Sequence, residues 1–193
     1  ALLFQIIRNL GLERRLVAAE NTQGAYADHT LNIVLVKEDK ISRYYCLSLF
    51  NSTLLNWLFR DQHTDINIKL AYLRDAPIRR INFTLSPDQR TSYLEKAKNL
   101  YQRCLDKNDQ ACVLGFVDRH LSQNPEESDV VHDLLAFLAG EMIRLNKEKQ
   151  TAQRQFLDWL TTTLNILPDK EGRHGIEALT AKDKLKDYPG DYQ

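Results

Sequence analysis

Residues 44–59 read Tyr-Tyr-Cys-Leu-Ser-Leu-Phe-Asn-Ser-Thr-Leu-Leu-Asn-Trp-Leu-Phe, and they carry the strongest structural signal in the chain. Residues 44–50 are apolar almost all round, which predicts a buried helix. Asn51 and Ser52 predict the start of a second helix over residues 53–59, because their side chains accept hydrogen bonds from the free backbone N–H groups at a helix start. Two short consecutive helices are therefore expected.

Short apolar or alternating runs with β-branched residues precede these helices, at residues 4–7, 15–19 and 31–36. Such runs are typical of strands. The segments between them, Asn9-Leu10-Gly11 and Asn21-Thr22-Gln23-Gly24, have the composition of turns. The first 40 residues are expected to be rich in β structure.

Another alternating run, residues 66–71, follows the helices and predicts a further strand. Pro77 ends this region, because proline has no backbone N–H to donate to a sheet ladder. Residues 1–85 are therefore interpreted as one α+β domain, in which a small β-rich part packs with helices.

The pattern becomes helical after residue 85. Ser86-Pro87 is typical of a helix start, with serine as the cap and proline at the first helical position, and this helix is expected to run to about Cys104. The apolar spacing over residues 113–121 predicts a short helix. Residues 124–129 predict a loop that ends in a helix cap.

A long helix is predicted from Val130 to Ile166, and residues 86–167 are interpreted as a helical region. Its apolar positions follow in steps of four and three, interrupted at Lys149, which is a heptad-like pattern. Such a helix usually packs along another element or a partner, so its seam is expected to be buried. The seam comprises Val131, Leu135, Leu138, Met142, Leu145, Ala152, Phe156, Trp159 and Thr163. Residues 168–193 form a polar C-terminal tail.

Composition limits the partners of the chain. The net charge of the 193 residues is zero, which argues against a general polyanion binder. Residues 1–85 hold 11 lysine and arginine residues against 8 aspartate and glutamate residues, so if one part of the chain contacts phosphate, it is expected to be this one. Three cysteines leave at least one unpaired, which fits a reducing cytoplasm. No apolar run approaches the roughly 18 residues that span a bilayer, so no membrane partner is expected.

The N-terminus has no signal-peptide pattern and resembles a strand entered partway, so the chain is expected to be a piece of a longer polypeptide. No local pattern for catalysis stands out either. Pro87-Asp88 and Pro168-Asp169 lack a following Glu-x-Lys, so they favour helix edges over a nuclease site. Cys104, Cys112 and His120 are too widely spaced for zinc, so the thiols are expected on buried helix faces.

The remaining histidines and aromatic residues favour structural roles. His29, His63, His132 and His174 are scattered, and most are expected to be surface or capping residues. The aromatic pairs Tyr44-Tyr45 and Trp57/Phe59 allow either base stacking or core packing, and their apolar neighbours favour core packing. No glycine-rich loop marks a nucleotide site. The chain itself is expected to hold no catalytic centre, metal or cofactor.

Residues 44–59 are also similar to a recurring segment of target-recognition domains in DNA methyltransferases, which links two helices and is followed by an apolar segment with proline. Residues 73–78, Leu-Arg-Asp-Ala-Pro-Ile, supply that second segment. Residues 16–20 and Gly24-Ala25-Tyr26 match the strand and turn that precede it. Five further segments resemble the C-terminal helical region of enzymes in which such a methyltransferase is fused to a restriction enzyme. They are residues 133–139, 142–147, 156–160, 176–180 and 184–188.

The chain thus resembles the TaqI-like C-terminal specificity domain of adenine-specific methyltransferases and of type IIG restriction–modification enzymes. The resemblance implies recognition of a specific site in double-stranded DNA, while an N-terminal methyltransferase or nuclease domain of the same parent chain performs the chemistry. The adenine-methylation signature Asn/Asp-Pro-Pro-Tyr is absent from this chain. S-adenosylmethionine is therefore expected in that separate domain.

Phosphate contacts from basic side chains and base contacts from polar ones are the physical means that the resemblance implies. Residues 21–29 are expected to read bases, because this loop is polar and lies between strands; an ordinary polar turn is the alternative. The two arginine pairs are expected to bind phosphate, with plain solvated pairs as the alternative. The predicted DNA-binding residues are Arg14, Arg15, Gln23, Tyr26, His29, Arg79 and Arg80.

Two other functions remain open. One alternative is a helical protein-interaction module, whose long helix docks a catalytic partner subunit. The other alternative is a standalone nuclease. Salt-dependent DNA binding would distinguish DNA recognition from protein docking. Metal-dependent cleavage by the chain alone would support the nuclease.

Overall fold

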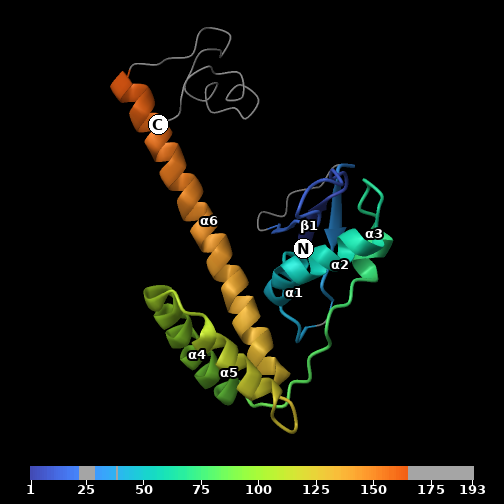
Figure 1. The fold of residues 1–193 in the computed structure, drawn as a ribbon, viewed down its shortest axis with the longest axis vertical. Coiled ribbons are helices and arrows are strands. Elements are labelled where there is room, and N and C mark those ends of the chain that lie inside the picture. Colours follow the sequence, from blue (N-terminus) through green and yellow to red (C-terminus); the bar gives the residue numbers. More distant parts are fainter. Residues whose placement is uncertain (22–28, 38, 165–193) are drawn as a thin grey trace. The chain divides into compact units, whose positions relative to one another are not determined.

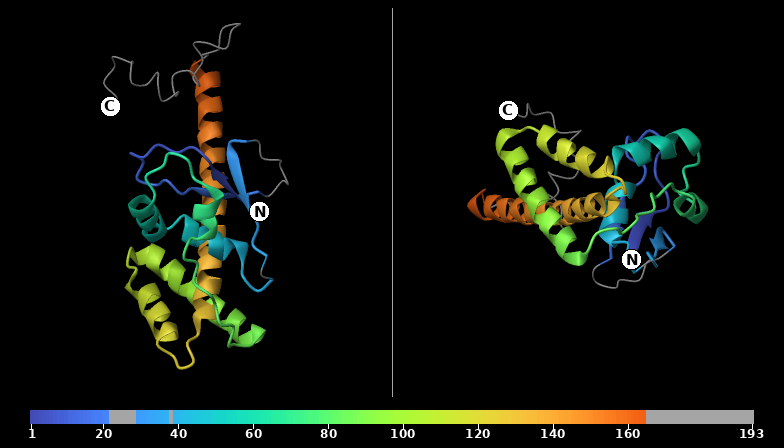
Figure 2. Two further views of the ribbon diagram at one scale, coloured as in Figure 1. Left: turned by 90° about the vertical axis from the view of Figure 1, so that its right-hand side faces the viewer. Right: turned by 90° about the horizontal axis from the view of Figure 1, so that it is seen from below.

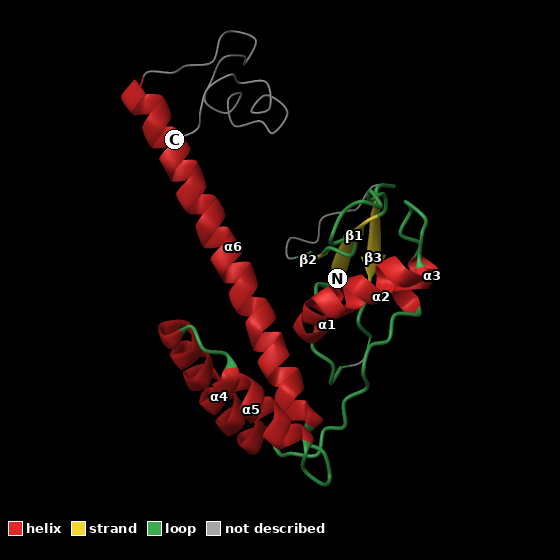
Figure 3. Ribbon diagram, in the orientation of Figure 1, coloured by secondary structure: helices red, strands yellow, loops and turns green. Residues whose placement is uncertain are grey.

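The computed structural model describes residues 1–21, 29–37 and 39–164, which form an α+β fold with a three-stranded antiparallel sheet and six helices (Figures 1 and 3). The strands are β1 (Leu2–Gln5), β2 (Ala18–Glu20) and β3 (Leu31–Val34), and β1 lies in the middle. The register pairs Leu3 with both Ala19 and Ile33. The predicted fold class and the predicted β-rich start are confirmed.

Two short helices follow the sheet, as residues 44–59 predict. They are α1 (Arg43–Phe50) and α2 (Thr53–Gln62), and Ser52 caps α2 by accepting a hydrogen bond from the Leu55 N–H. The sheet face that carries Leu2 and Phe4 is buried, and the Phe4 ring meets the Phe50 ring edge-on with centroids 4.9 Å apart. Helix α1 therefore closes one side of the sheet core.

Asn51 and Asn56 attach the helix pair to the strand region, because their side-chain amides pair with backbone N–H and carbonyl groups there as a neighbouring strand would. The Asn56 amide accepts from the Leu16 N–H at 2.7 Å and donates to the Leu16 carbonyl at 3.1 Å. Asn51 makes the same pair of bonds with Ala18, at 2.9 and 3.0 Å. Backbone groups buried away from water need such partners. The segment around Leu16 is thus held by side chains of the helices.

The strand predicted over residues 66–71 is wrong for most of its length. Only one antiparallel bridge forms there, between Ile7 and Asn67. The chain then turns into α3 (Leu70–Arg74). The alternating pattern misled because only Ile68 among its isoleucines enters the core, whereas the helical turn brings Leu73 inside.

Three helices follow: α4 (Pro87–Lys107), α5 (Ala111–Leu121) and α6 (Ser128–Leu164). Ser86 and Gln89 form a capping box at the start of α4, as the Ser-Pro signal predicts in part. Helices α4 and α5 and the first turns of α6 lie side by side (Figures 1 and 2) around a common core. That core contains Ala97, Phe116, Val130 and Leu134.

The chain divides into two compact units, Ala1–Glu141 and Met142–Gln193. The boundary predicted at residue 85 lies inside the first unit. The reason is visible at Asp129, whose carboxylate accepts hydrogen bonds from the backbone N–H groups of Thr84 and Leu85. Asp129, at the predicted cap, therefore holds the segment that leads into α4. The predicted tail, 168–193, lies outside the described residues.

The α6 seam, which is expected to be buried against neighbouring helices or a partner, is covered by the described residues of this chain only in part. Leu138 packs against the core of the first unit. Four large side chains further along the seam are exposed: Met142, Leu145, Phe156 and Trp159. Apolar spacing locates a helical stripe, but it does not reveal whether the chain itself covers that stripe.

Candidate nucleic-acid interface

A groove with a volume of about 820 Å³ lies beside β3, and we call it the β3 groove. Its walls come from β3 and the residues after it, from α1, and from residues 70–80. Buried Cys46, Phe50 and Leu73 contribute apolar surface. Four cations line it as well: Lys37, Arg74, Arg79 and Arg80. No carboxylate occurs among its described lining residues, so the groove is electropositive over an apolar surface.

The four cations differ in how strongly they are already paired. Arg79 donates to both carboxylate oxygens of Glu126, at 2.6 and 2.7 Å, so an anion must compete with that carboxylate. Arg74 contacts Asp75 at 3.3 Å, and both side chains are exposed. Within the described parts of the chain, neither Lys37 nor Arg80 has an ion pair. These two are the cations most available to a phosphate.

The predicted phosphate contact at Arg15 is wrong. Its side chain is buried, with 1% of the residue's surface exposed. One guanidinium nitrogen donates to the His63 carbonyl at 2.6 Å, and the other donates to the Asp65 carbonyl. Desolvation by burial lowers the pKa of Arg15 from its ordinary value. Arg15 therefore holds the end of α2, and only its neighbour Arg14 faces solvent.

The structure brings Arg79 and Arg80 into one groove but leaves Arg14, Arg15 and His29 apart from it. Arg14 and His29 are exposed, and neither lines the β3 groove. Gln23 and Tyr26 lie outside the described residues. Sequence reasoning missed Lys37 and Arg74. Their signals were present, since Lys37 ends an apolar strand pattern and Arg74 lies within the apolar segment that precedes Pro77.

A second electropositive groove, of about 570 Å³, lies between α4 and α5, and we call it the α4–α5 groove. Lys96, Arg103 and Arg119 contribute its cations. Its single carboxylate among the described lining residues belongs to Glu127, which is bonded to His120. These three basic residues are spread along helix faces, where a sequence pattern cannot distinguish them from solvated residues.

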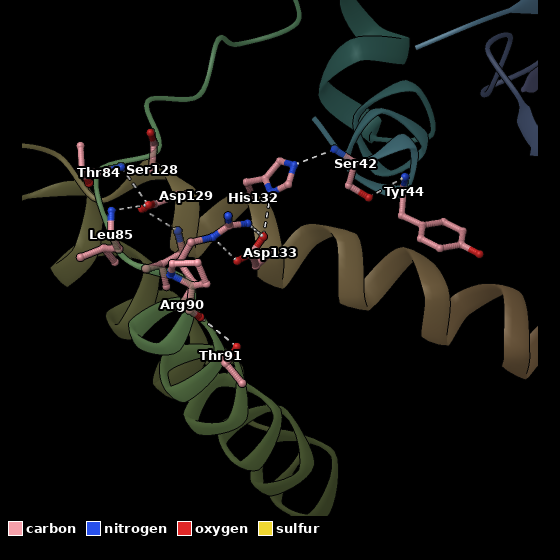
Figure 4. Close-up of polar contacts among 12 residues, drawn as sticks. Ser42, Tyr44, Thr84, Leu85, Arg90, Thr91, Ser128, Asp129, His132 and Asp133 are labelled. Atoms are coloured by element: carbon pink, nitrogen blue, oxygen red, sulfur yellow. Dashed lines mark hydrogen bonds and ion pairs between the residues drawn. The ribbon is translucent and has the colours of Figure 1, made fainter. Parts of the chain in front are cut away.

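Ser42, His132 and Asp133 have the residue types of a hydrolytic triad, and Figure 4 shows how they lie. The His132 Nε2 atom accepts from the backbone N–H of Ser42 at 2.9 Å, while Nδ1 lies 2.8 Å from Asp133. The Ser42 hydroxyl instead accepts from the Tyr44 N–H as the cap of α1. A serine nucleophile needs its hydroxyl on the imidazole. This arrangement instead binds α1 to α6.

Two expectations about histidines and aromatic residues are corrected here. His132, one of the scattered histidines, is buried rather than on the surface, because it lies against aromatic rings and bonds to a carboxylate. His120 is buried in the same way. Trp57 is 63% exposed, although Tyr45 and Phe59 are buried as expected. On the helix surface Trp57 borders a smaller groove with Arg60 and His63.

Two other kinds of site, a metal centre and a membrane-spanning helix, have no support within the described residues. No group of three or more potential metal ligands occurs in the described parts of the chain. Among the described helices, none combines the length and apolar character needed to cross a membrane. No family model, curated protein or solved structure matches the chain.

Proposed function

We propose that this chain is the DNA-recognition part of a cytoplasmic restriction–modification methyltransferase, and that the β3 groove binds the phosphate backbone of double-stranded DNA. The observation that carries the proposal is the collection of four cations in one groove without a lining carboxylate among the described residues. Lysine and arginine that contact phosphate release counterions, which favours binding. A chain of zero net charge can bind DNA this way only through a local patch.

The groove supplies affinity, and recognition of the site needs contacts with base edges. We assign that role to residues 21–29, which precede β3 in the sequence and contain Gln23, Tyr26 and His29. Glutamine and histidine offer hydrogen bonds to bases, and tyrosine offers hydrogen bonding and stacking. Substituting Gln23 or His29 by alanine should relax preference at one base pair and cost about 1–3 kcal/mol there.

Methylation and any cleavage belong in this proposal to an N-terminal domain of the parent chain, with S-adenosylmethionine bound there. The network of Ser42, His132 and Asp133 has a structural role, since its serine hydroxyl caps α1. In this proposal the chain binds the DNA, and the separate domain supplies the catalytic groups. Incubating the chain alone with methyl donor and DNA, and separately with magnesium and DNA, should give neither methylation nor cleavage.

The decisive experiment measures DNA affinity against salt for two matched triple variants. Fluorescence anisotropy with a labelled duplex, between roughly 50 and 200 mM salt, gives the slope of log affinity against log salt. Combining Lys37→Ala, Arg74→Ala and Arg80→Ala removes three charges from the β3 groove. This should flatten the slope by roughly 2–3 units, at about 0.9 per phosphate contact.

The control variant combines Lys96→Ala, Arg103→Ala and Arg119→Ala, which removes the same charge from the α4–α5 groove. It should leave the slope within about one unit of the wild type. A flattened slope in the control alone would place DNA on the α4–α5 groove. Unchanged slopes in both variants would reject DNA binding at either groove.

A second candidate function rests on a different observation, the exposed stripe of Met142, Leu145, Phe156 and Trp159 on α6. Large exposed apolar side chains on one stripe favour a docking face. We assign the catalytic domain or subunit as its occupant. Coexpression with the polypeptide encoded immediately upstream should yield a complex that Phe156→Ser with Trp159→Ser disrupts. Equal complex formation by wild type and double variant would reject this role for α6.

A further inference from the structure

Two thiols lie close together where α4 meets α5. The Sγ atoms of Cys104 and Cys112 are 2.6 Å apart. A covalent disulfide holds its sulfur atoms at about 2.05 Å, so little movement separates this pair from a bond. Neither of these two cysteines is in a disulfide in the structure.

The turn between the helices explains why the thiols meet. Asn108 adopts a left-handed backbone conformation with φ 50°, which reverses the chain at the end of α4. The N–H groups of Asn108 and Asp109 both donate to the Cys104 carbonyl. The Asp109 carboxylate accepts from the Ala111 N–H at 2.9 Å, where α5 begins. The sulfur atoms are therefore carried by two helices joined through an ordered turn.

We propose that Cys104 and Cys112 are a reversible redox site that forms a disulfide by exchange with a small-molecule disulfide such as oxidised glutathione. The Cys112 thiolate attacks one sulfur of the glutathione disulfide, forms a mixed disulfide and releases one glutathione thiolate. The Cys104 thiolate then attacks the Cys112 sulfur and releases the second glutathione thiolate. Two protein thiols lose two protons and two electrons, and one glutathione disulfide becomes two reduced glutathione molecules.

The order of attack follows from exposure and from protonation. Cys112 is half-buried, whereas only 8% of Cys104 is exposed, so a dissolved disulfide reaches Cys112 more easily. The hydrogen bond with Cys112, followed by burial, raises the pKa of the Cys104 thiol. The thiolate is the nucleophile in exchange. Cys104 therefore keeps its proton at first and acts second, once the sulfur of Cys112 carries a leaving group.

Peptide mapping of the whole folded chain tests the proposal. Trypsin cleaves after Arg103, Lys107 and Arg119, so Cys104 and Cys112 fall in separate peptides, residues 104–107 and 108–119. After incubation with oxidised glutathione and acid quenching, these two peptides should be found joined. Dithiothreitol should separate them. The variant Cys46→Ser is the matched control and should keep the joined peptide, whereas Cys104→Ser and Cys112→Ser should lose it.

Unfolding distinguishes a site built by the fold from two cysteines that are merely close in sequence. The folded chain should form the bond about tenfold faster than the chain in urea, because the fold holds the thiols together. Equal rates would overturn the proposal. So would a stable glutathione adduct on Cys112 without joined peptides, or a disulfide between two copies of the chain.

Discussion

Around Asn56 the chain buries polar side chains, whereas along the second half of α6 it exposes large apolar ones. Asn56 is 2% exposed and Arg15 is 1% exposed, yet both make their hydrogen bonds to backbone groups. Phe156 and Trp159 are more than half exposed. Hydrophobic burial drives folding in general, but here burial and hydrophobicity do not coincide.

The difference separates residues that hold this chain together from residues that contribute little to its own core. A buried polar side chain that bonds to backbone groups is costly to alter, because its substitution leaves those groups without a hydrogen-bond partner. An exposed aromatic side chain contributes little to the folding of its own chain. Substitutions around Asn56 should therefore lower the stability of the chain much more than substitutions on the exposed stripe of α6. Substitutions of exposed residues should instead have the larger effect on binding of DNA or of a partner.

The largest loss of stability is expected for Asn56→Leu. The substitution removes bonds to the Leu16 N–H and to the carbonyls of Leu16, Phe50 and Ser52. Leaving buried backbone groups unpaired should cost about 3–5 kcal/mol of unfolding free energy, measured by urea denaturation. The exposed Asn99→Leu in α4 serves as control and should change stability by less than about 0.5 kcal/mol. Similar losses at both positions would remove the distinction.

Neighbouring arginines provide the next comparison. Arg15→Met should destabilise the chain by about 2–4 kcal/mol, because the His63 and Asp65 carbonyls lose their donors and the end of α2 loses its anchor. Arg14→Ala should stay within about 0.5 kcal/mol, since its side chain is exposed. Thermal denaturation of both variants checks this. If Arg15→Met melted like the wild type and weakened DNA binding, the earlier phosphate assignment would be restored.

Asp133 gives a prediction that depends on pH. Burial alone raises the pKa of its carboxyl, but hydrogen bonds from His132 and Arg90 outweigh burial and leave the pKa below its usual range. Stability from a lowered carboxyl pKa is fully present above the unfolded pKa, near 3.9, and is lost as pH falls through the folded pKa. Asp133→Asn should therefore cost about 1–3 kcal/mol at pH 7.

The difference between wild type and Asp133→Asn should shrink as the pH falls below about 4, because the carboxyl of the unfolded chain binds a proton there before the carboxyl of the folded chain does. Urea denaturation at pH 7 and at pH 3 measures it. Asp158→Asn in α6 is the control, since Asp158 is exposed. A difference that stayed constant across this pH range would mean that the carboxylate charge does not stabilise the Arg90 contact.

Sequence reasoning located the elements whose signal is local and failed where a distant residue decides. The helix pair was predictable because Ser52 and the apolar residues around it specify a cap and a core face within one short stretch. Helix α3 was not predictable, because Ile66, Ile68 and Leu70 alternate like the residues of a strand. In the structure Ile68 is buried, whereas Ile66 and Leu70 are exposed. Predicted element bounds otherwise lie within a few residues of those observed.

The candidate site shows the same limit. Arg79 and Arg80 were predictable as a basic pair, but the pairing of Arg79 with Glu126 joins residues 47 positions apart. Arg14 and Arg15 look alike in the sequence, and their environments differ completely. Lys37 joined the site only when β3 and the residues after Pro77 met at one groove. A charge pattern names candidates, and three-dimensional contacts decide among them.

The smallest effect on folding is expected for Trp159→Ala, although alanine replaces the largest side chain of the α6 stripe. Trp159 is 57% exposed and stacks on Phe156, with ring centroids 5.9 Å apart. The substitution should therefore change unfolding free energy by less than about 0.5 kcal/mol, since alanine also favours helices. Leu134→Ala in the buried part of the same helix is the control and should cost about 2–5 kcal/mol. Circular dichroism melts of the two variants compare them directly. A loss at Trp159 as large as that at Leu134 would mean that this stripe is covered when the chain is alone in solution, and docking of a catalytic partner on α6 would lose its support.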